Sequence, residues 1–291
     1  MLAEFPPARP ERRREGGGLV YNPVYALPWA RRKTFLLDDN VDANAPMMLA
    51  ELTWPEVRDL AAEVTLVLLP VGACEQHGPG MTLGTDIRLA TEVCREVSRR
   101  LHPRVLVAPP LPWGLSDHHL GFPGTISLHP DTFYAVLRDV VTSLLGHGFR
   151  RYLLVNGHGG NMALTDVVCT RLRRETAVEV VGALTYFTLS STQVGHGGEV
   201  EASYALALAP DVVRSERLRA EVPAAPLPDV RPAIVPWAFH ELTHSGNLGD
   251  PALASAEKGR AMLAPMLDRL CEIVIALGEQ APPFQRSFTP P

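Results

Sequence analysis

The sequence predicts a single α/β domain with a mainly parallel β-sheet and helices on both faces of the sheet. Two observations predict this fold class. Short apolar runs rich in β-branched residues alternate with longer segments whose apolar residues recur at helical spacing. In addition, acidic and imidazole side chains gather directly after the apolar runs, and in folds of this class ligands bind outside the carboxyl ends of the strands.

The first half of the domain contains two strand–helix pairs. Residues 64–73 form a β-branched apolar run, as expected of a parallel strand buried on both faces. Residues 87–101 carry one apolar stripe and are predicted to be a helix. Residues 104–111 are strand-like, and residues 131–148 have the spacing of a helix that ends at a glycine.

The second half continues the alternation. Residues 150–157 are a predicted strand, and residues 161–175 are a predicted helix with Asn161 as its N-cap. Residues 178–187 complete the set of predicted strands. Each of these strands is followed by a loop rich in glycine.

Two further helices and an extension complete the chain. Residues 199–209 and 254–280 are predicted helices, with a bend expected at Pro265. Residues 1–46 are rich in proline, arginine and glycine and lack periodicity, which predicts an irregular N-terminal extension. The domain itself is expected to span residues 47–291.

Composition excludes several classes of protein. Of 291 residues, 46% are apolar and 20% are charged, which is ordinary for a globular domain. The net charge of −5 offers no basic patch for nucleic acid, and no apolar run approaches the length of a membrane span. The four cysteines are widely spaced without a CxxC pair, so we expect a reduced, cytoplasmic protein without disulfides.

Acidic and imidazole side chains follow four of the predicted strands. Glu75, His77 and Asp86 follow the first, and the segment "WGLSDHHLGFPGT" follows the second. The segment "NGHGGN" with His158 follows the third, and "GHGGEVEAS" with Glu199 follows the fourth. Glycines beside them allow the backbone to approach closely. The four loops should therefore meet at one edge of the sheet.

Carboxylates and imidazoles without thiolates favour zinc, manganese or a similar divalent ion. Glu75 and His77 project to the same side of an extended backbone and could each bind a different ion, with Asp86 as a bridge. His158 and Glu199 could complete the two shells. Three carboxylates and a bridging hydroxide balance the charge of two divalent cations.

Each of these residues also has an ordinary interpretation. A single histidine is more often structural than catalytic, and "HGGN" alone could be a turn. Glu201, two residues after Glu199, could be a solvated helix acid or a residue that supports a ligand. The coincidence of four such loops is what favours a metal site.

Five segments together resemble the creatininase (creatinine amidohydrolase) family. They are "EQHGPGMTLGTD", "FPGT", "NGHGGN", "HGGEVEAS" and "GDPALASAEKG", and the resemblance covers residues 48 to about 280. It implies one α/β domain, a dinuclear metal site, hydrolysis of a C–N bond and a homo-hexameric assembly. The implied cofactor is two divalent ions per subunit, zinc or manganese, with iron as a further option.

The resemblance also implies roles for individual residues. One ion would take Glu75, Asp86 and His158, and the other would take His77, Asp86 and Glu199. His196 matches a histidine that the family uses near the substrate, so it is the candidate proton shuttle. Ser116 matches a serine that contacts substrate, and His119 lies in the same loop.

One departure leaves the substrate open. Relatives commonly have "EQHGPHLPL", whereas this chain has glycine, methionine and threonine at residues 80–82. The Trp-Asp pair that creatininase places around creatinine is also missing from residues 186–195. Creatinine is therefore not the expected substrate.

The sequence thus predicts a metal-dependent amidohydrolase. Two ions would lower the pKa of a bridging water, and the resulting hydroxide would attack an amide, lactam or formamide carbonyl. The alternatives are a peptidase of the same family that trims a modified peptide, and a non-catalytic protein that binds a small molecule. A dinuclear phosphoesterase is less favoured, because Arg88 is the only basic side chain near the four loops.

Overall fold

A computed structural model of the chain describes residue 45, residues 47–220 and residues 237–280. All of them belong to one compact unit. Apart from residue 45, the predicted N-terminal extension lies outside the described residues. The expected start of the domain at residue 47 therefore stays a prediction.

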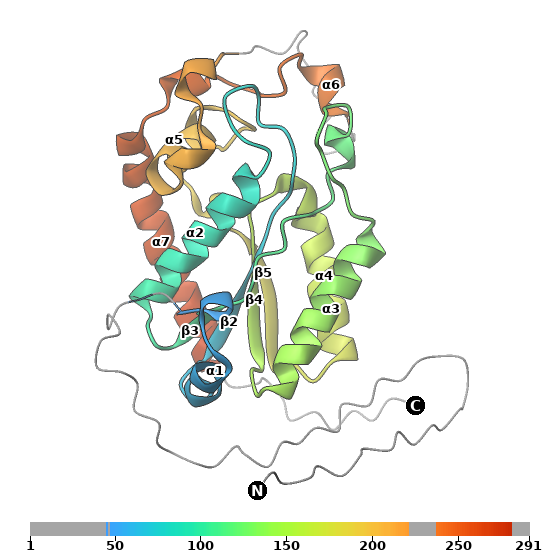
Figure 1. Cartoon of the computed structure of the whole chain (residues 1–291), viewed down its shortest axis with the longest axis vertical. Coiled ribbons are helices and arrows are strands. Elements are labelled where there is room, and N and C mark those ends of the chain that lie inside the picture. Colours follow the sequence, from blue (N-terminus) through green and yellow to red (C-terminus); the bar gives the residue numbers. More distant parts are fainter. Residues whose placement is uncertain (1–44, 46, 221–236, 281–291) are drawn as a thin grey trace, which may run out of the picture. The chain divides into compact units, whose positions relative to one another are not determined.

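The described residues are built around one five-stranded sheet in which every neighbouring pair of strands is parallel (Figure 1). The spatial order is β1-β3-β2-β4-β5, so β2 and β4 lie at the centre. Each of these two strands has six residues, and all of them except Arg151 are buried, because helices cover both faces of the sheet. The strands are β1 (Met47–Met48), β2 (Leu66–Val71), β3 (Val105–Val107), β4 (Arg151–Asn156) and β5 (Val180–Thr185).

Helices α2 (Thr85–Arg100), α5 (Glu199–Leu208) and α7 (Ala256–Glu279) pack on one face of the sheet (Figure 1). Their apolar side chains share a core with alternate residues of the strands, including Leu68 and Val155. Packing in this shared core fixes the positions of α2 and α5 on the sheet. That matters for function, because both helices begin at the carboxyl edge of the sheet.

Helices α1 (Trp54–Leu60), α3 (Pro130–Gly146) and α4 (Met162–Glu175) cover the opposite face. The strand residues that point toward them, such as Leu69 and Leu154, form a second core with Phe133 and Val168. The two cores use alternating residues of the same strands, as the two-residue period of a strand requires. The predicted fold class is therefore confirmed.

The structure contains elements that were not predicted, and it shows how Pro265 and Asn161 are accommodated. The two-residue strand β1, helix α1 and the short helix α6 (Phe239–Leu242) were not predicted. Helix α7 continues through Pro265. Asn161 precedes α4 but makes no capping hydrogen bond. Its amide instead binds Leu115 N, Gly72 O and Asn156 Oδ1, so it ties together three loops at the carboxyl edge.

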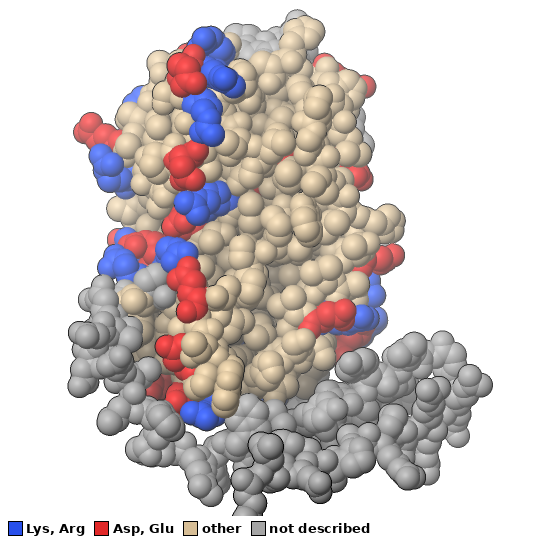
Figure 2. Space-filling view, viewed as in Figure 1, with Lys and Arg blue, Asp and Glu red and all other residues tan. Residues whose placement is uncertain are grey.

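Basic and acidic side chains lie together on the outer face of α2, in the middle part of the red and blue strip in Figure 2. Arg99 and Arg100 both pair with Glu96 at helical spacing. Exposed pairs of this kind contribute little to stability, about 0.3–0.5 kcal/mol each. All four cysteines are free. None of the helices in the described ranges combines the length and the apolar composition that a bilayer span requires.

Candidate metal centre

The two central strands deliver the first two loops of the site to the same place. Val71, the last residue of β2, pairs with Asn156, the last residue of β4. Glu75 and His158 follow these residues within four positions, so both side chains emerge at one edge of the sheet. Asn156 then shapes its own loop, because its amide binds both the N–H and the carbonyl of His158.

The N-terminus of α2 brings Asp86 between these loops. Two glycines make this close approach possible. A Cβ on Gly72 would lie 2.6 Å from the backbone nitrogen of Ile87, and one on Gly157 would lie 2.5 Å from the carbonyl oxygen of Asp86. Larger residues at either position would push the helix away. The first turn of a helix also favours a carboxylate, because the unpaired N–H groups there carry partial positive charge.

Asp86 lies between two buried imidazoles. Its Oδ1 is 2.8 Å from His77 Nε2, and its Oδ2 is 3.0 Å from His158 Nδ1. His158 Nδ1 is also 3.1 Å from Glu75 Oε1. All four side chains are at most 3% exposed. The structure therefore brings together Glu75, His77, Asp86 and His158, four of the five expected metal ligands.

The fifth expected ligand, Glu199, lies elsewhere. Its Oε1 is 2.6 Å from Lys258 Nζ, and its side chain is 37% exposed. The carboxylate that reaches the cluster belongs to Glu201, whose Oε1 is 3.6 Å from His77 Nε2 and whose Oε2 accepts a hydrogen bond from Gly197 N. Residues two apart on an α-helix point in directions about 200° apart, so only one of the two glutamates can face the cluster.

The orientation of the His158 ring is fixed by contacts on the side away from Glu75 and Asp86. Its Nε2 lies 3.0 Å from the carbonyl oxygen of Leu115 and 3.3 Å from Ser116 Oγ. A carbonyl only accepts, so Nε2 always carries a proton, and Nδ1 is the atom that faces Glu75 and Asp86 and would offer a lone pair to a metal ion once the ring is neutral. Metal-bound histidines are typically held in this way. Ser116, expected to contact substrate, is fully buried against His158 instead of lining the cavity.

Two more histidines, His119 and His196, flank Glu75. His119 Nε2 lies 3.3 Å from Glu75 Oε1, and His196 Nδ1 lies 3.8 Å from the same oxygen. Both rings contact Gln76. Its side-chain nitrogen is 2.9 Å from His119 Nδ1, and its backbone oxygen is 2.7 Å from His196 Nε2. Both histidines line the cavity, as their expected roles near a substrate require.

The buried groups shift one another's pKa values strongly. Burial lowers the pKa of His158, but Glu75 and Asp86 outweigh burial and raise it to about 10. Asp86 and Glu201 likewise outweigh burial and raise the pKa of His77 well above its usual value. Burial, reinforced by the Asp86 charge, raises the pKa of Glu75. Burial and the neighbouring His77 and His119 hold the pKa of His196 well below its ordinary value.

Imidazole nitrogens approach this cluster to within 3.3 Å, yet three of its buried oxygens accept no hydrogen bond of good geometry from the described residues. They are both carboxylate oxygens of Glu75 and Oδ2 of Asp86. Unpaired buried carboxylate oxygens cost several kcal/mol unless a cation or donor reaches them. Groups of three donor atoms from this cluster lie within 4.8 Å of one another, among them Glu75–His77–Asp86 and His77–His196–Glu201. The donor set therefore fits divalent metal ions.

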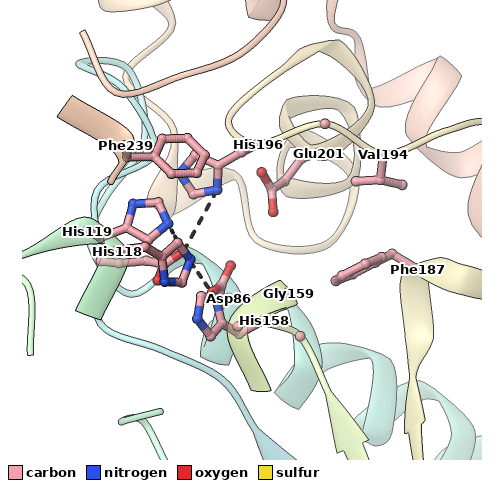
Figure 3. Close-up of a pocket in the computed structure, with 14 residues that line it drawn as sticks. Asp86, His118, His119, His158, Gly159, Phe187, Val194, His196, Glu201 and Phe239 are labelled. Atoms are coloured by element: carbon pink, nitrogen blue, oxygen red, sulfur yellow. Dashed lines mark ion pairs between the residues drawn. The ribbon is translucent and has the colours of Figure 1, made fainter. Parts of the chain in front are cut away.

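A cavity of about 260 Å³ opens beside this cluster. Figure 3 shows Phe187 and Val194 on the side opposite His118 and His119, with Phe239 stacked close to His119. The lining side chains in the described ranges include no lysine or arginine. The cavity thus combines a polar wall of acids and imidazoles with an apolar wall.

Sequence reasoning missed four residues of this site. The role of Glu201 was left open between a solvated acid and a residue that supports a ligand. No role was assigned to Gln76, His118 and Phe239. His118 lies in the loop segment that was singled out, and its ring stacks 5.6 Å from that of His158. Phe239 follows a segment without any motif, so the sequence held no signal for it. Gln76 stands between two expected ligands, which was a usable signal.

Comparison with known proteins shows the family to which the chain belongs. The family model for creatininase, described as creatinine amidohydrolase, matches residues 50–274. A mycofactocin precursor peptide peptidase from Mycobacterium ulcerans is 35% identical over 226 residues, which cover 74% of this chain and 83% of that protein. The creatinine amidohydrolase of Pseudomonas putida is 32% identical over 267 residues, covering 81% of this chain and 98% of that protein.

Solved structures of creatininase share the fold. A manganese form has a TM-score of 0.68 and 31% identity, covering 81% of this chain and 100% of that chain. A zinc–zinc form of a creatininase variant has a TM-score of 0.67 and the same identity, covering 80% of this chain and 98% of that chain. On the family match and these relatives together, the chain is a member of the creatininase family of hydrolases.

Proposed function

We propose that the protein hydrolyses the C–N bond of an amide by using two divalent metal ions bound in the cavity. The main support is the cluster of three buried carboxylates, Glu75, Asp86 and Glu201, two of which have buried oxygens that accept no hydrogen bond of good geometry. Such a concentration of buried negative charge is unfavourable on its own and suits two divalent cations, zinc or manganese.

The contacts among the buried side chains support one assignment of the metal ligands. Glu75, Asp86 and His158 would hold one ion, and His77, Asp86 and Glu201 would hold the other. Asp86 is the natural bridge, because its two oxygens face different imidazoles. Glu201 replaces Glu199 in this assignment. When bound, the ions would supply a water of lowered pKa and would polarise the substrate carbonyl.

The remaining residues would bind and orient the substrate and move protons. His196 would take up or release a proton at Nδ1, because its Nε2 is committed to the Gln76 carbonyl. His119 would position the substrate beside Glu75. Ser116 would act through His158 by helping to fix its ring. The apolar wall of Phe187 and Val194, opposite the histidines, would receive an uncharged part of the substrate.

A peptide substrate is the second candidate within this proposal. The observation that favours it is the identity to peptide peptidases, which is slightly higher than that to creatinine amidohydrolase. The absence of lysine and arginine from the described cavity lining argues that the group next to the reacting bond is not anionic. A peptide whose reacting bond lies away from its C-terminal carboxylate is therefore the first peptide to test.

The decisive experiment is a hydrolysis screen with zinc or manganese added. Creatinine, cyclic ureides, lactams, formamides and short peptides would be incubated with the protein and with an Asp86→Asn variant. We expect hydrolysis of at least one class by the parent protein alone, detected by mass spectrometry as the gain of one water or as two cleavage products. Tight binding of a compound without hydrolysis under either metal would instead favour the non-catalytic alternative.

The homo-hexamer implied by the family resemblance remains a prediction. Light scattering coupled to size exclusion would test it against the chain mass of 31.7 kDa. A mass about six times that value is expected.

A further inference from the structure

Gln76 is a buried residue whose side chain contacts two histidines of the site. It lies between the proposed ligands Glu75 and His77 in sequence, and it is only 6% exposed. Its side chain forms no hydrogen bond with any of the three carboxylates of the cluster. Instead it reaches two cavity histidines, with its Nε2 atom 2.9 Å from His119 Nδ1 and 3.1 Å from His196 Nε2.

The direction of the Gln76 amide is set by the backbone. Gly78 N donates to Gln76 Oε1 over 2.9 Å, and an N–H donor requires an oxygen there. The amide nitrogen must therefore face the histidines. The site also constrains the loop that covers Gln76, because a Cβ on Gly246 would lie 1.8 Å from Oε1. Gly246 has a φ of +98°, which favours glycine.

This orientation determines which nitrogen of His119 carries the proton. The Gln76 amide nitrogen can only donate, so the facing Nδ1 atom of His119 accepts and bears the lone pair. The proton of the neutral ring then sits on Nε2, the atom that lies 3.3 Å from Glu75 Oε1. His119 thus presents an N–H group to the cluster, which makes it a hydrogen-bond donor there and unsuited to binding a metal ion.

His196 has the opposite arrangement. Its Nε2 atom meets the Gln76 carbonyl oxygen at 2.7 Å, and this oxygen can only accept. Nε2 therefore carries the proton, and Nδ1 presents a lone pair toward Glu75. The alternative, acceptance from the Gln76 side chain at 3.1 Å, would set a lone pair against the nearer carbonyl oxygen.

We propose that Gln76 is a positioning residue that assigns opposite tautomers to His119 and His196, with its side chain acting on the first and its carbonyl on the second. As a consequence, the two imidazoles beside Glu75 have different roles. One imidazole donates a hydrogen bond, and the other has a free lone pair with which to move a proton. The proposal deepens the proposed function, because His196 is the proton carrier in it.

Nitrogen NMR tests the proposal without turnover. In protein labelled with ¹⁵N-histidine, a ring nitrogen with a lone pair resonates far downfield of one that carries a proton. We expect a downfield Nδ1 and an upfield Nε2 for His119, and the reverse pattern for His196. The His119→Gln and His196→Gln variants assign the signals. A protonated Nδ1 on His119 in the parent protein would overturn the proposal.

Gln76→Glu is the sharpest variant. It keeps the acceptor for Gly78 N and replaces the amide donor by a carboxylate oxygen. The His119 proton should move to Nδ1, so its two nitrogen signals should exchange positions or the ring should become doubly protonated. An unchanged His119 pattern would contradict the assigned role. Gln76→Met, which removes both polar atoms, should give a mixture of His119 tautomers and serves if the first variant does not fold.

Ser98→Ala is the matched control. Ser98 is fully buried and makes two hydrogen bonds, to Met47 N and Val105 O, without contacting a histidine. Its loss should lower stability and leave both histidine patterns unchanged. Recording spectra with zinc and without metal separates the two claims. Failure of the metal hypothesis would leave the His119 pattern readable, and failure of the Gln76 hypothesis would leave metal binding intact.

Discussion

Glu199 and Glu201 stand two residues apart at the start of α5, and their carboxylates face different surroundings. Glu201 Oε1 lies 3.6 Å from the buried His77 Nε2, whereas Glu199 Oε1 lies 2.6 Å from the partly exposed Lys258 Nζ. Both residues are glutamates in the first turn of the same helix. They therefore form a natural matched pair for testing which carboxylate binds metal.

Glu201→Gln should remove one of the two ions. The amide keeps the shape of the side chain but loses the negative charge that a divalent ion requires, so one site should weaken by more than about 10²-fold, beyond the usual effect of a residue that only supports a ligand. Elemental analysis after dialysis should find about one ion per chain. Glu199→Gln should retain the metal content of the parent protein. The opposite result for the pair would return Glu199 to the ligand set.

Asp86→Asn should weaken both sites together, because each of its oxygens faces a different imidazole. Titration with zinc in the presence of a competing chelator would measure both affinities. His77→Gln should weaken mainly one site. Glu92→Gln, a change on the exposed face of the same helix where Glu92 pairs with Arg88, is the control. Two tight sites in Asp86→Asn would exclude a bridge.

His196→Ala should retain both metal ions and lose most of its activity. Its Nδ1 atom is the proposed site of proton transfer, and loss of such a group typically costs ~10²–10⁴ in rate. The rate would be measured on whichever substrate the screen identifies, alongside metal content. His129→Ala, at a side chain that is 75% exposed, should behave like the parent protein. Metal loss in proportion to activity would make His196 a ligand instead.

Metal binding should release protons near neutral pH. In the metal-free protein, the carboxylates around them raise the pKa of His158 to about 10 and that of His77 well above its usual value. Both rings are then protonated at pH 7, and the metal must displace those protons. Calorimetric titrations with zinc in buffers of different ionisation enthalpy would count them. Zinc affinity should rise with pH up to about 10, and a pH-independent affinity would contradict the ligand roles.

The fold was predictable because its signals are local and repeated. Each central strand is an unbroken apolar run such as residues 66–71, and each long helix has an apolar stripe. The elements that were missed are small. Strand β1 has two residues, α6 has four and α1 has seven, so none is long enough to show a clear period. Helix α7 continues through Pro265, so the proline does not end the helix.

The site was predictable where motif and topology agree. Glu75, His77, Asp86 and His158 follow central strands or begin a helix, so their place at the carboxyl edge followed from the fold. The choice between Glu199 and Glu201 depended instead on the rotation of α5 about its axis. That rotation is set by packing against α7 and α2, which no local pattern in residues 199–209 reveals.

A structure of the zinc-loaded protein with anomalous scattering at the zinc edge tests the central claim most directly. The account predicts two zinc peaks, with Asp86 in contact with both, Glu75 and His158 on one, and His77 and Glu201 on the other. Glu199 should stay with Lys258. A single peak, or two peaks with Glu201 out of reach and Glu199 bound, would contradict the dinuclear assignment made here.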